Sequence, residues 1–292
     1  MEKTHGESDF PCLKCRLLIF ACLCTIIIFF LTKIPICRYF IKMIAYYLTV
    51  LTTTILCCTI STAIYFFGDV PKFIFGAFRI LASWTNIKYE VRGSQNFDGI
   101  GPFVVVSNHQ SSLDILSLAH VWPERCTVMM KQSLRWVPFL NYVAFLSRAI
   151  YVDRFCHTKA VHAIKTSADT IIAKNTSVWV FPEGTRNHEG GMLAFKKGAF
   201  NIAVQVQIPI VPVVISSYRP FYDKNLRIFN EYGYVIIEVM EPVLTKNMSL
   251  DDVPLLTDRV REQMMEVYER ISGEAAEKCK LKTSFMLRCI SI

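Results

Sequence analysis

The chain has 292 residues, of which 52% are hydrophobic and 19% charged, and its mean hydropathy is +0.34. This composition is too apolar for an ordinary soluble domain and too charged for a bundle buried in a membrane throughout. The net charge of +8 suits anionic lipid surfaces and phosphate-bearing substrates. It also suits nucleic acid, but the chain has no zinc-ligand, RRM-like or basic-helix pattern, so we expect no nucleic-acid partner.

The apolar excess is concentrated before about residue 85, in two uncharged runs, Leu17–Leu31 and Met43–Phe67. The first run barely reaches the roughly 20 residues that a membrane-spanning helix needs, and the second is long enough. Basic residues flank both runs, so the positive-inside rule gives no orientation, and a hairpin embedded in one leaflet is an open alternative. The segment Val70–Trp84 is typical of an amphipathic connector at the interface. We predict that residues 1–85 anchor the protein to a lipid bilayer.

After about residue 86, short apolar segments alternate with helical patterns, which predicts an α/β domain with a mixed sheet flanked by helices. The predicted strands are Lys88–Arg92, Phe103–Ser107, Thr127–Met130, Ala149–Val152, Ser177–Phe181, Ile210–Ser216 and Val235–Val239. The predicted helices are Ser112–Val121, His157–Ala173, Ala194–Val206 and Val253–Ser272. The domain is expected over residues 86–275, with a C-terminal tail over 276–292.

His109 and Asp114 follow the apolar strand that ends near Val106 and are five positions apart. On one continuous helix this offset would leave their side chains about 140° apart, so they meet only if His109 lies on the loop and Asp114 in the first helical turn. Ser111 and Asp114 form an S-x-x-D capping pattern, which begins a helix at that point. The carboxylate can then fix the imidazole tautomer and leave the other nitrogen to accept a proton. The alternative interpretation is a capped helix after a polar loop, which explains Asp114 fully.

A second motif, F-P-E-G-T-R, occupies residues 181–186 at the end of a predicted strand. Pro182 would end that strand, and Gly184 permits a tight turn. Arg186 can make two parallel hydrogen bonds to a phosphate. Glu183 can orient Arg186 or receive a hydrogen bond from a substrate hydroxyl.

Lys131 and Arg154 follow two further predicted strands. Ligands of open α/β sheets bind at the carboxyl ends of the strands. Any one of these basic residues is explained by a solvated surface, but basic residues at three strand ends predict a phosphate site. A metal site is not expected, because no other histidine or carboxylate follows a ligand spacing. A serine nucleophile is not expected either, because the chain has no G-x-S-x-G elbow.

The pattern Asn108-His109-x4-Asp114, followed by the F-P-E-G-T-R motif, resembles the glycerolipid acyltransferases and in particular the 1-acylglycerol-3-phosphate (lysophosphatidate) acyltransferases. The resemblance spans about residues 90–240 in the family's order and continues through residues 192–200 and 208–214. One segment departs from the family, because the glycines expected near Leu140 and Ser147 are absent.

The resemblance implies that His109, oriented by Asp114, takes the proton from the sn-2 hydroxyl of lysophosphatidic acid. The oxygen would then attack the thioester of acyl-CoA, a co-substrate, giving phosphatidic acid without a metal, a cofactor or a covalent enzyme intermediate. The residues implied in holding the acceptor phosphate are Lys131, Arg154, Glu183, Gly184, Thr185 and Arg186.

Resemblance to the animal enzymes implies the endoplasmic reticulum membrane. Two alternatives stay open: an acyltransferase for another acceptor (glycerol 3-phosphate, a lysophospholipid with a head group, or lysocardiolipin), and a lipid-binding membrane protein without turnover. Neither the oligomeric state nor the acyl-chain preference follows from the sequence.

Overall fold

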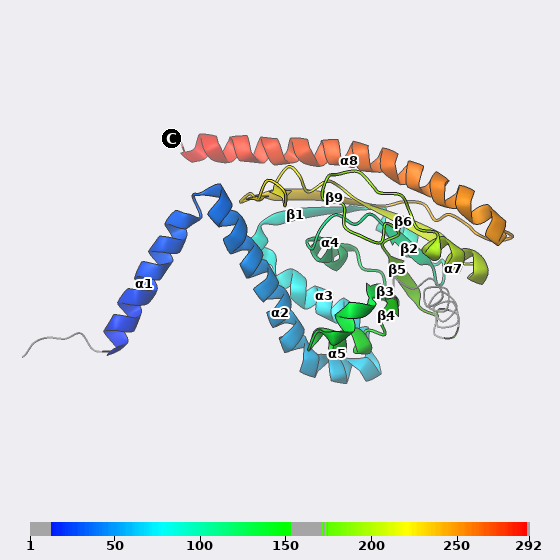
Figure 1. The fold of residues 1–292 in the computed structure, drawn as a ribbon, viewed down its shortest axis with the longest axis horizontal. Helices are drawn as coiled ribbons and strands as arrows, with labels where there is room; N and C mark the ends of the chain where they lie inside the picture. Colours follow the sequence, from blue (N-terminus) through cyan, green and yellow to red (C-terminus); the bar gives the residue numbers. More distant parts are fainter. Residues whose placement is uncertain (1–12, 153–170, 172, 174, 291–292) are drawn as a thin grey trace, which may run out of the picture.

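The protein is described by a computed structural model that covers residues 13–152, 171, 173 and 175–290 (Figure 1). Within these residues, one seven-stranded sheet has the order β1-β9-β6-β2-β5-β3-β4. Its strands are β1 (Ile87–Arg92), β2 (Val104–Ser107), β3 (Cys126–Lys131), β4 (Ile150–Val152), β5 (Ser177–Val180), β6 (Ile210–Ile215) and β9 (Gly233–Val239). Neighbours are parallel except β6 and β9, which are antiparallel. The predicted α/β class and mixed sheet are confirmed.

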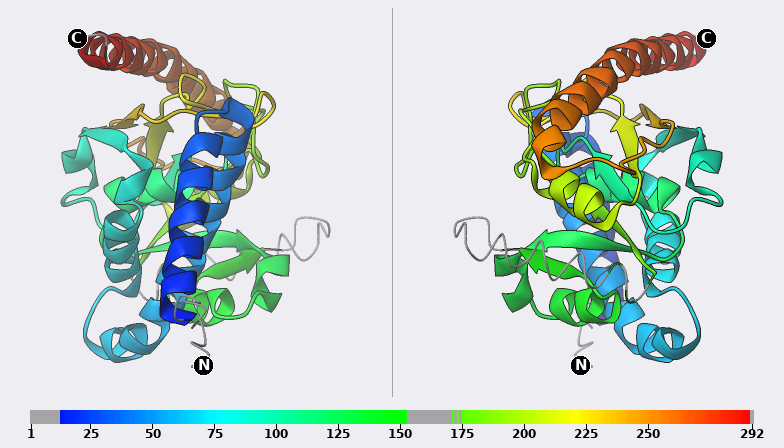
Figure 2. Two further views of the ribbon diagram at one scale, coloured as in Figure 1. Left: turned by 90° about the vertical axis from the view of Figure 1, so that its left-hand side faces the viewer. Right: turned by 90° about the vertical axis from the view of Figure 1, so that its right-hand side faces the viewer.

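The two faces of the sheet bury different sets of side chains, because successive residues of a strand point to opposite sides. Val105 packs in one core with α2 (Pro35–Phe67), α3 (Val70–Leu81) and α4 (Asp114–Val121). Val104 and Val106 pack in the other core with the helices α7 and α8. These two helices span Gly198–Val206 and Val253–Ile290. Figures 1 and 2 show α8 as one long helix along its side of the sheet.

The N-terminal module consists of α1 (Leu13–Leu31) and α2, joined by a short turn. Within the described residues, the segment Pro35–Cys58 of α2 can cross a membrane by its length and composition, whereas the apolar part of α1, Arg16–Ile27, is shorter. Helix α2 has 33 residues and is therefore about 50 Å long. One stripe of α2 packs against the domain, and its outward side carries exposed leucine, isoleucine and phenylalanine side chains.

Several predicted boundaries differ from the structure. Helix α4 begins at Asp114 rather than Ser112, and α7 begins at Gly198 rather than Ala194. Among the residues before α7, Lys196 donates its backbone N–H to the carbonyl of Pro182 over 2.8 Å, so this segment is bound to the loop after β5 instead of forming a helical turn. Helix α8 continues past 272 to Ile290, without a break at the predicted tail boundary, and the division into domains stays a prediction.

The segment between β3 and β4 forms two elements that the sequence did not predict, the 3-10 helix η3 (Gln132–Trp136) and α5 (Leu140–Leu146). The expected glycines are absent here, yet residues adjacent to both sites have left-handed backbone, with φ of +61° at Phe139 and +55° at Arg148. Backbone with a positive φ favours glycine. Because this chain has Phe139 and Arg148 at these positions, the two turns carry local backbone strain. The predicted helix His157–Ala173 lies outside the described residues, apart from residues 171 and 173.

Candidate functional site

His109 and Asp114 are joined within the loop that leads from β2 into α4. The Nδ1 atom of His109 lies 2.6 Å from Oδ2 of Asp114. The same oxygen accepts hydrogen bonds from the backbone N–H groups of Gln110, at 2.9 Å, and Ser111, at 3.1 Å. Asp114 is only 2% exposed and is the first residue of α4. The carboxylate therefore holds the Nδ1–H tautomer, which leaves Nε2 as the basic nitrogen.

The imidazole of His109 is also fixed from one side. It stacks on the ring of Phe181, with centroids 4.1 Å apart and an angle of 21° between the planes. Its side chain is 17% exposed, so one edge faces outward. Nε2 makes no hydrogen bond with any described residue, and it is therefore open to a substrate proton.

The residues on either side of His109 tie its loop to the end of β6. The buried amide of Asn108 donates to the carbonyl of Ile215 over 2.9 Å and accepts from the N–H of the same residue over 2.8 Å. The amide of Gln110 donates to the carbonyls of Ile215 and Ser216. Through these bonds the side chains of Asn108 and Gln110 continue the contact between β2 and β6 beyond the end of β2. The backbone that carries the imidazole is therefore fixed.

Glu183 joins the two sequence motifs. Its Oε1 accepts the backbone N–H of His109 at 2.8 Å, and its Oε2 accepts the N–H of Leu193 at 2.9 Å. Burial raises the pKa of the Glu183 carboxyl, and the two N–H groups oppose that rise. Both oxygens of this carboxylate therefore bind backbone amides, and the described residues show no contact between Glu183 and Arg186. The carboxylate positions the His109 loop against the loop after β5.

Replacing Glu183 with glutamine tests this role. The amide has one acceptor oxygen where the carboxylate has two, so one buried N–H loses its partner. We expect the free energy of unfolding to fall by about 1–3 kcal/mol and kcat to fall with it. Denaturant unfolding and initial rates measure both quantities. Glu189→Gln, an exposed change in the same loop, is the control; identical stability and kcat in the two variants would contradict the role.

Gly184, Thr185, Arg186 and Lys131 follow the carboxyl ends of β5 and β3, on the same side of the sheet as the His109 loop. Gly184 has a φ of +71°, a backbone conformation that favours glycine, and a Cβ there would also require the side chain of Lys196, 2.8 Å away, to move. Thr185 and Arg186 are exposed, and Arg186 forms no ion pair or hydrogen bond with the described residues. Lys131 is the last residue of β3, two strands from β2. Arg154 lies outside the described residues.

An apolar cavity of about 200 Å³ lies between α2, α3, α4, α5 and β3. Ile115, which directly follows Asp114, contributes to its wall. Other lining side chains are Val50, Phe75, Phe78, Met130, Val143 and Ala144. The cavity can accommodate hydrocarbon because almost every lining side chain is apolar. No group of three or more histidine, cysteine or carboxylate residues suited to a metal occurs in the described part of the chain.

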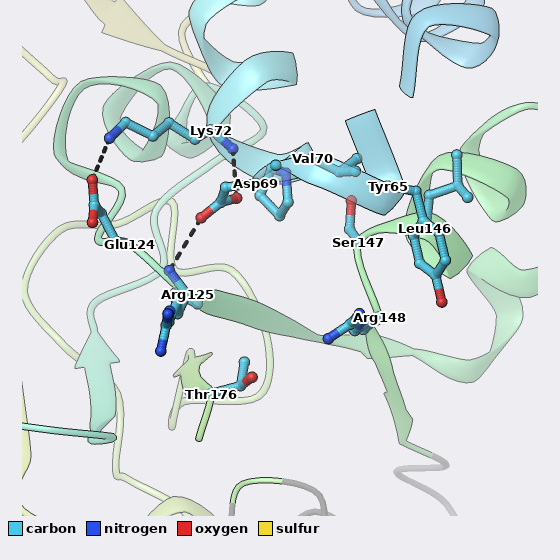
Figure 3. Close-up of a pocket in the computed structure, with 13 residues that line it drawn as sticks. Tyr65, Asp69, Val70, Lys72, Glu124, Arg125, Leu146, Ser147, Arg148 and Thr176 are labelled. Carbon is cyan, nitrogen blue, oxygen red and sulfur yellow. Dashed lines mark hydrogen bonds and ion pairs between the residues drawn. The ribbon is translucent and has the colours of Figure 1, made fainter. Parts of the chain in front are cut away.

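A larger, polar cavity of about 660 Å³ lies away from His109 (Figure 3). Arg125, Arg148 and Thr176 line it and lie one or two residues before β3, β4 and β5, so it is at the edge of the sheet opposite the two motifs. Its wall is held by Asp69, which accepts the backbone N–H groups of Lys72 and Arg125, as Figure 3 shows. This cavity is therefore separate from the candidate active site.

Helix α2 contacts the His109 loop directly. The fully buried Tyr46 donates its hydroxyl to the carbonyl of Ser112 over 2.6 Å, and Tyr47 donates to the hydroxyl of Ser112 over 3.1 Å. Ser112 lies between the two partners of the His–Asp pair. Helix α2 thus positions the His109 loop. The hydrophobic pattern of the sequence predicted a membrane helix here but not this contact.

Tyr46→Phe removes one hydroxyl from this contact and keeps the ring. We expect a loss of about 1 kcal/mol in stability, as for a typical hydrogen bond, and a fall in kcat of about tenfold as the loop loosens. Turnover at saturating substrates measures the effect. Tyr65→Phe, near the far end of the same helix, serves as the control; equal kcat in both variants would rule out a positioning role for Tyr46.

The chain is similar to known proteins in sequence and in fold. The sequence profile of a family described as Acyltransferase matches residues 88–216. A Caenorhabditis elegans protein, acl-2, provisionally named a 1-acyl-sn-glycerol-3-phosphate acyltransferase, is 41% identical over 87% of this chain and 93% of its own length. The mouse 1-acyl-sn-glycerol-3-phosphate acyltransferase alpha is 45% identical over 64% of this chain and 66% of its own length.

The fold also has a counterpart among solved structures. The crystal structure of the 1-acyl-sn-glycerophosphate (LPA) acyltransferase PlsC from Thermotoga maritima superposes with a TM-score of 0.60. The alignment covers 81% of this chain and 97% of that chain, at 23% identity. At this level of identity the similarity concerns the fold.

Proposed function

Because this chain belongs to the 1-acyl-sn-glycerol-3-phosphate acyltransferase family, we propose that it transfers an acyl chain from acyl-CoA to the sn-2 hydroxyl of 1-acyl-sn-glycerol 3-phosphate, giving phosphatidic acid. The observation that carries the proposal is the 2.6 Å contact between His109 and Asp114, held beside the F-P-E-G-T-R loop by Glu183.

The chemical step follows from the open nitrogen of His109. Nε2 takes the proton of the sn-2 hydroxyl while that oxygen attacks the thioester carbonyl. The new C–O ester bond forms, the C–S bond breaks, and the CoA thiolate receives the proton that His109 holds. Asp114 stabilises the imidazolium formed in between. General-base catalysis of this kind contributes about 10²–10⁴ in rate.

The acceptor phosphate is assigned to the basic residues at the carboxyl ends of β5 and β3. Arg186 is exposed and without an anionic partner in the described structure, which suits a phosphate. Lys131 lies at the end of β3 at the same edge, and Arg154 joins the set on sequence grounds alone. Gly184 and Thr185 supply the turn that presents Arg186, and Glu183 acts as the positioning residue for His109.

Lipid access is assigned to the side of the domain covered by α2. The outward side of this helix is apolar, and the 200 Å³ cavity between α2, α3 and α5 would receive an acyl chain. An acyl chain in this cavity would avoid water while the thioester lies near His109. The protein would thus act at the surface of a lipid bilayer. We assign it to the endoplasmic reticulum membrane because of its resemblance to the animal enzymes.

A panel of acceptors with one labelled acyl-CoA tests the function. We expect purified protein in phosphatidylcholine vesicles to acylate lysophosphatidic acid with the highest kcat/KM. The panel includes glycerol 3-phosphate, lysophosphatidylcholine and lysocardiolipin. Preference for one of these would reassign the acceptor, and no transfer to any of them would support a lipid-binding protein without turnover.

A further inference from the structure

A small hollow beside His109 is lined by cationic side chains that the motifs do not include. Its volume is about 20 Å³, and its walls come from the loops after β2, β5 and β6. The lining residues include Gln110, Ser111, His188, Arg219, Tyr222 and Lys224. Gln110 directly follows His109, and the N–H of Asn187 donates to the carbonyl of His109 over 2.8 Å. The lining of the hollow therefore includes residues that adjoin the backbone of His109.

The turn that carries Lys224 has a fixed shape. It joins the short strands β7 (Tyr222–Asp223) and β8 (Ile228–Phe229). The carboxylate of Asp223, 5% exposed, accepts the N–H groups of Asn225 and Leu226 and lies 3.5 Å from the guanidinium of Arg219. Asp223 and Arg219 thus neutralise one another, and the ammonium of Lys224 projects from an ordered hairpin.

Among the described residues that line the hollow, Lys224 is the remaining cation, and Arg186 lies two positions before the lining residue His188. Nζ of Lys224 lies 3.3 Å from Nε2 of His188, and neither Lys224 nor Arg186 pairs with a carboxylate in the described part of the chain. Burial, followed by the charges of Lys224 and Arg186, lowers the pKa of His188. The lowered pKa favours neutral His188, whose Nε2 can accept a hydrogen bond from Lys224.

We propose that Arg186, His188 and Lys224 form a subsite for the phosphate monoester of the acceptor, in which Lys224 favours a monoester over a diester. This inference rests on the proposed function. A monoester carries three terminal oxygens and a charge of about −1.5 to −2 at neutral pH, as a phosphorylated side chain does, whereas a diester has two such oxygens and a single charge. The third oxygen and the added charge suit a further cationic donor beside Arg186, and Lys224, which lies next to His188, supplies it.

Lys224→Met tests the subsite. Loss of one charge-assisted hydrogen bond should raise KM for lysophosphatidic acid about tenfold or more. We expect kcat at saturating acceptor and KM for acyl-CoA to stay unchanged, and KM for lysophosphatidylglycerol, a diester, to change less. Lys224→Arg keeps the charge and should restore KM. The matched control is Lys280→Met, an exposed lysine on α8.

The outcomes separate this inference from the function on which it rests. Wild-type protein without transfer to any lysolipid would defeat the proposed function itself. Active wild-type protein with the same KM for lysophosphatidic acid in Lys224→Met would overturn the subsite. An equal rise in KM for monoester and diester, or a fall in kcat alone, would overturn the assigned selectivity.

Discussion

The variant His109→Ala is expected to lose about 10²–10⁴ in kcat for acyl transfer while keeping its fold, because the alcohol then has no positioned base. The imidazole is 17% exposed, and its Nε2 has no partner in the described structure. The backbone N–H of residue 109, which Glu183 binds, survives the substitution. Release of CoA, followed with a thiol reagent, measures the rate, and thermal unfolding shows whether the protein is intact.

His120→Gln is the matched control for that loss. This imidazole lies in the last turn of α4, where it stacks on Tyr89 and contacts the carbonyl of Leu116. Its change should leave the rate close to wild type, because it has no part in the proposed chemistry. Near wild-type turnover in His109→Ala would remove His109 as the base, and the assignment of the site would move elsewhere.

The second large effect is expected for Asp114→Asn, with a loss of at least about 10² and up to about 10⁴ in kcat. The corresponding change behind the catalytic histidine of serine proteases costs about 10⁴. In this chain Oδ2 of Asp114 accepts three donors: Nδ1 of His109 and the N–H groups of Gln110 and Ser111. An amide whose oxygen takes the place of Oδ2 can keep these bonds, but it is neutral and therefore no longer stabilises the imidazolium. Its NH₂ then lies at the buried position of Oδ1, which has no hydrogen-bond partner in the described structure.

A double variant distinguishes orientation of His109 from general damage. If Asp114 acts only through the imidazole, Asp114→Asn should add almost nothing to the loss in His109→Ala, since residues that act as a unit are not additive. Asp98→Asn, an exposed carboxylate before β2, controls for the removal of one negative charge. Fully additive losses would show that Asp114 contributes by another route.

The fold was predictable because its signals are local. Runs such as Val104–Ser107 and Ile210–Ile215 are apolar and β-branched, and buried parallel strands have this composition. The boundaries shifted where tertiary contacts compete with helix propensity. The residues before α7 show this, because the backbone N–H of Lys196 binds the carbonyl of Pro182 in the loop after β5.

The sequence by itself determined the strand–loop–helix unit that brings His109 to Asp114, because five residues and a helix start suffice for that contact. It also determined the apolar α2 and the glycine turn at Gly184. Only the tertiary structure decided that Glu183 binds the His109 loop, that Tyr46 supports Ser112 and that Lys224 faces His188. These partners lie 36 to 74 positions apart, and their contacts depend on which strands neighbour one another, which local periodicity does not encode.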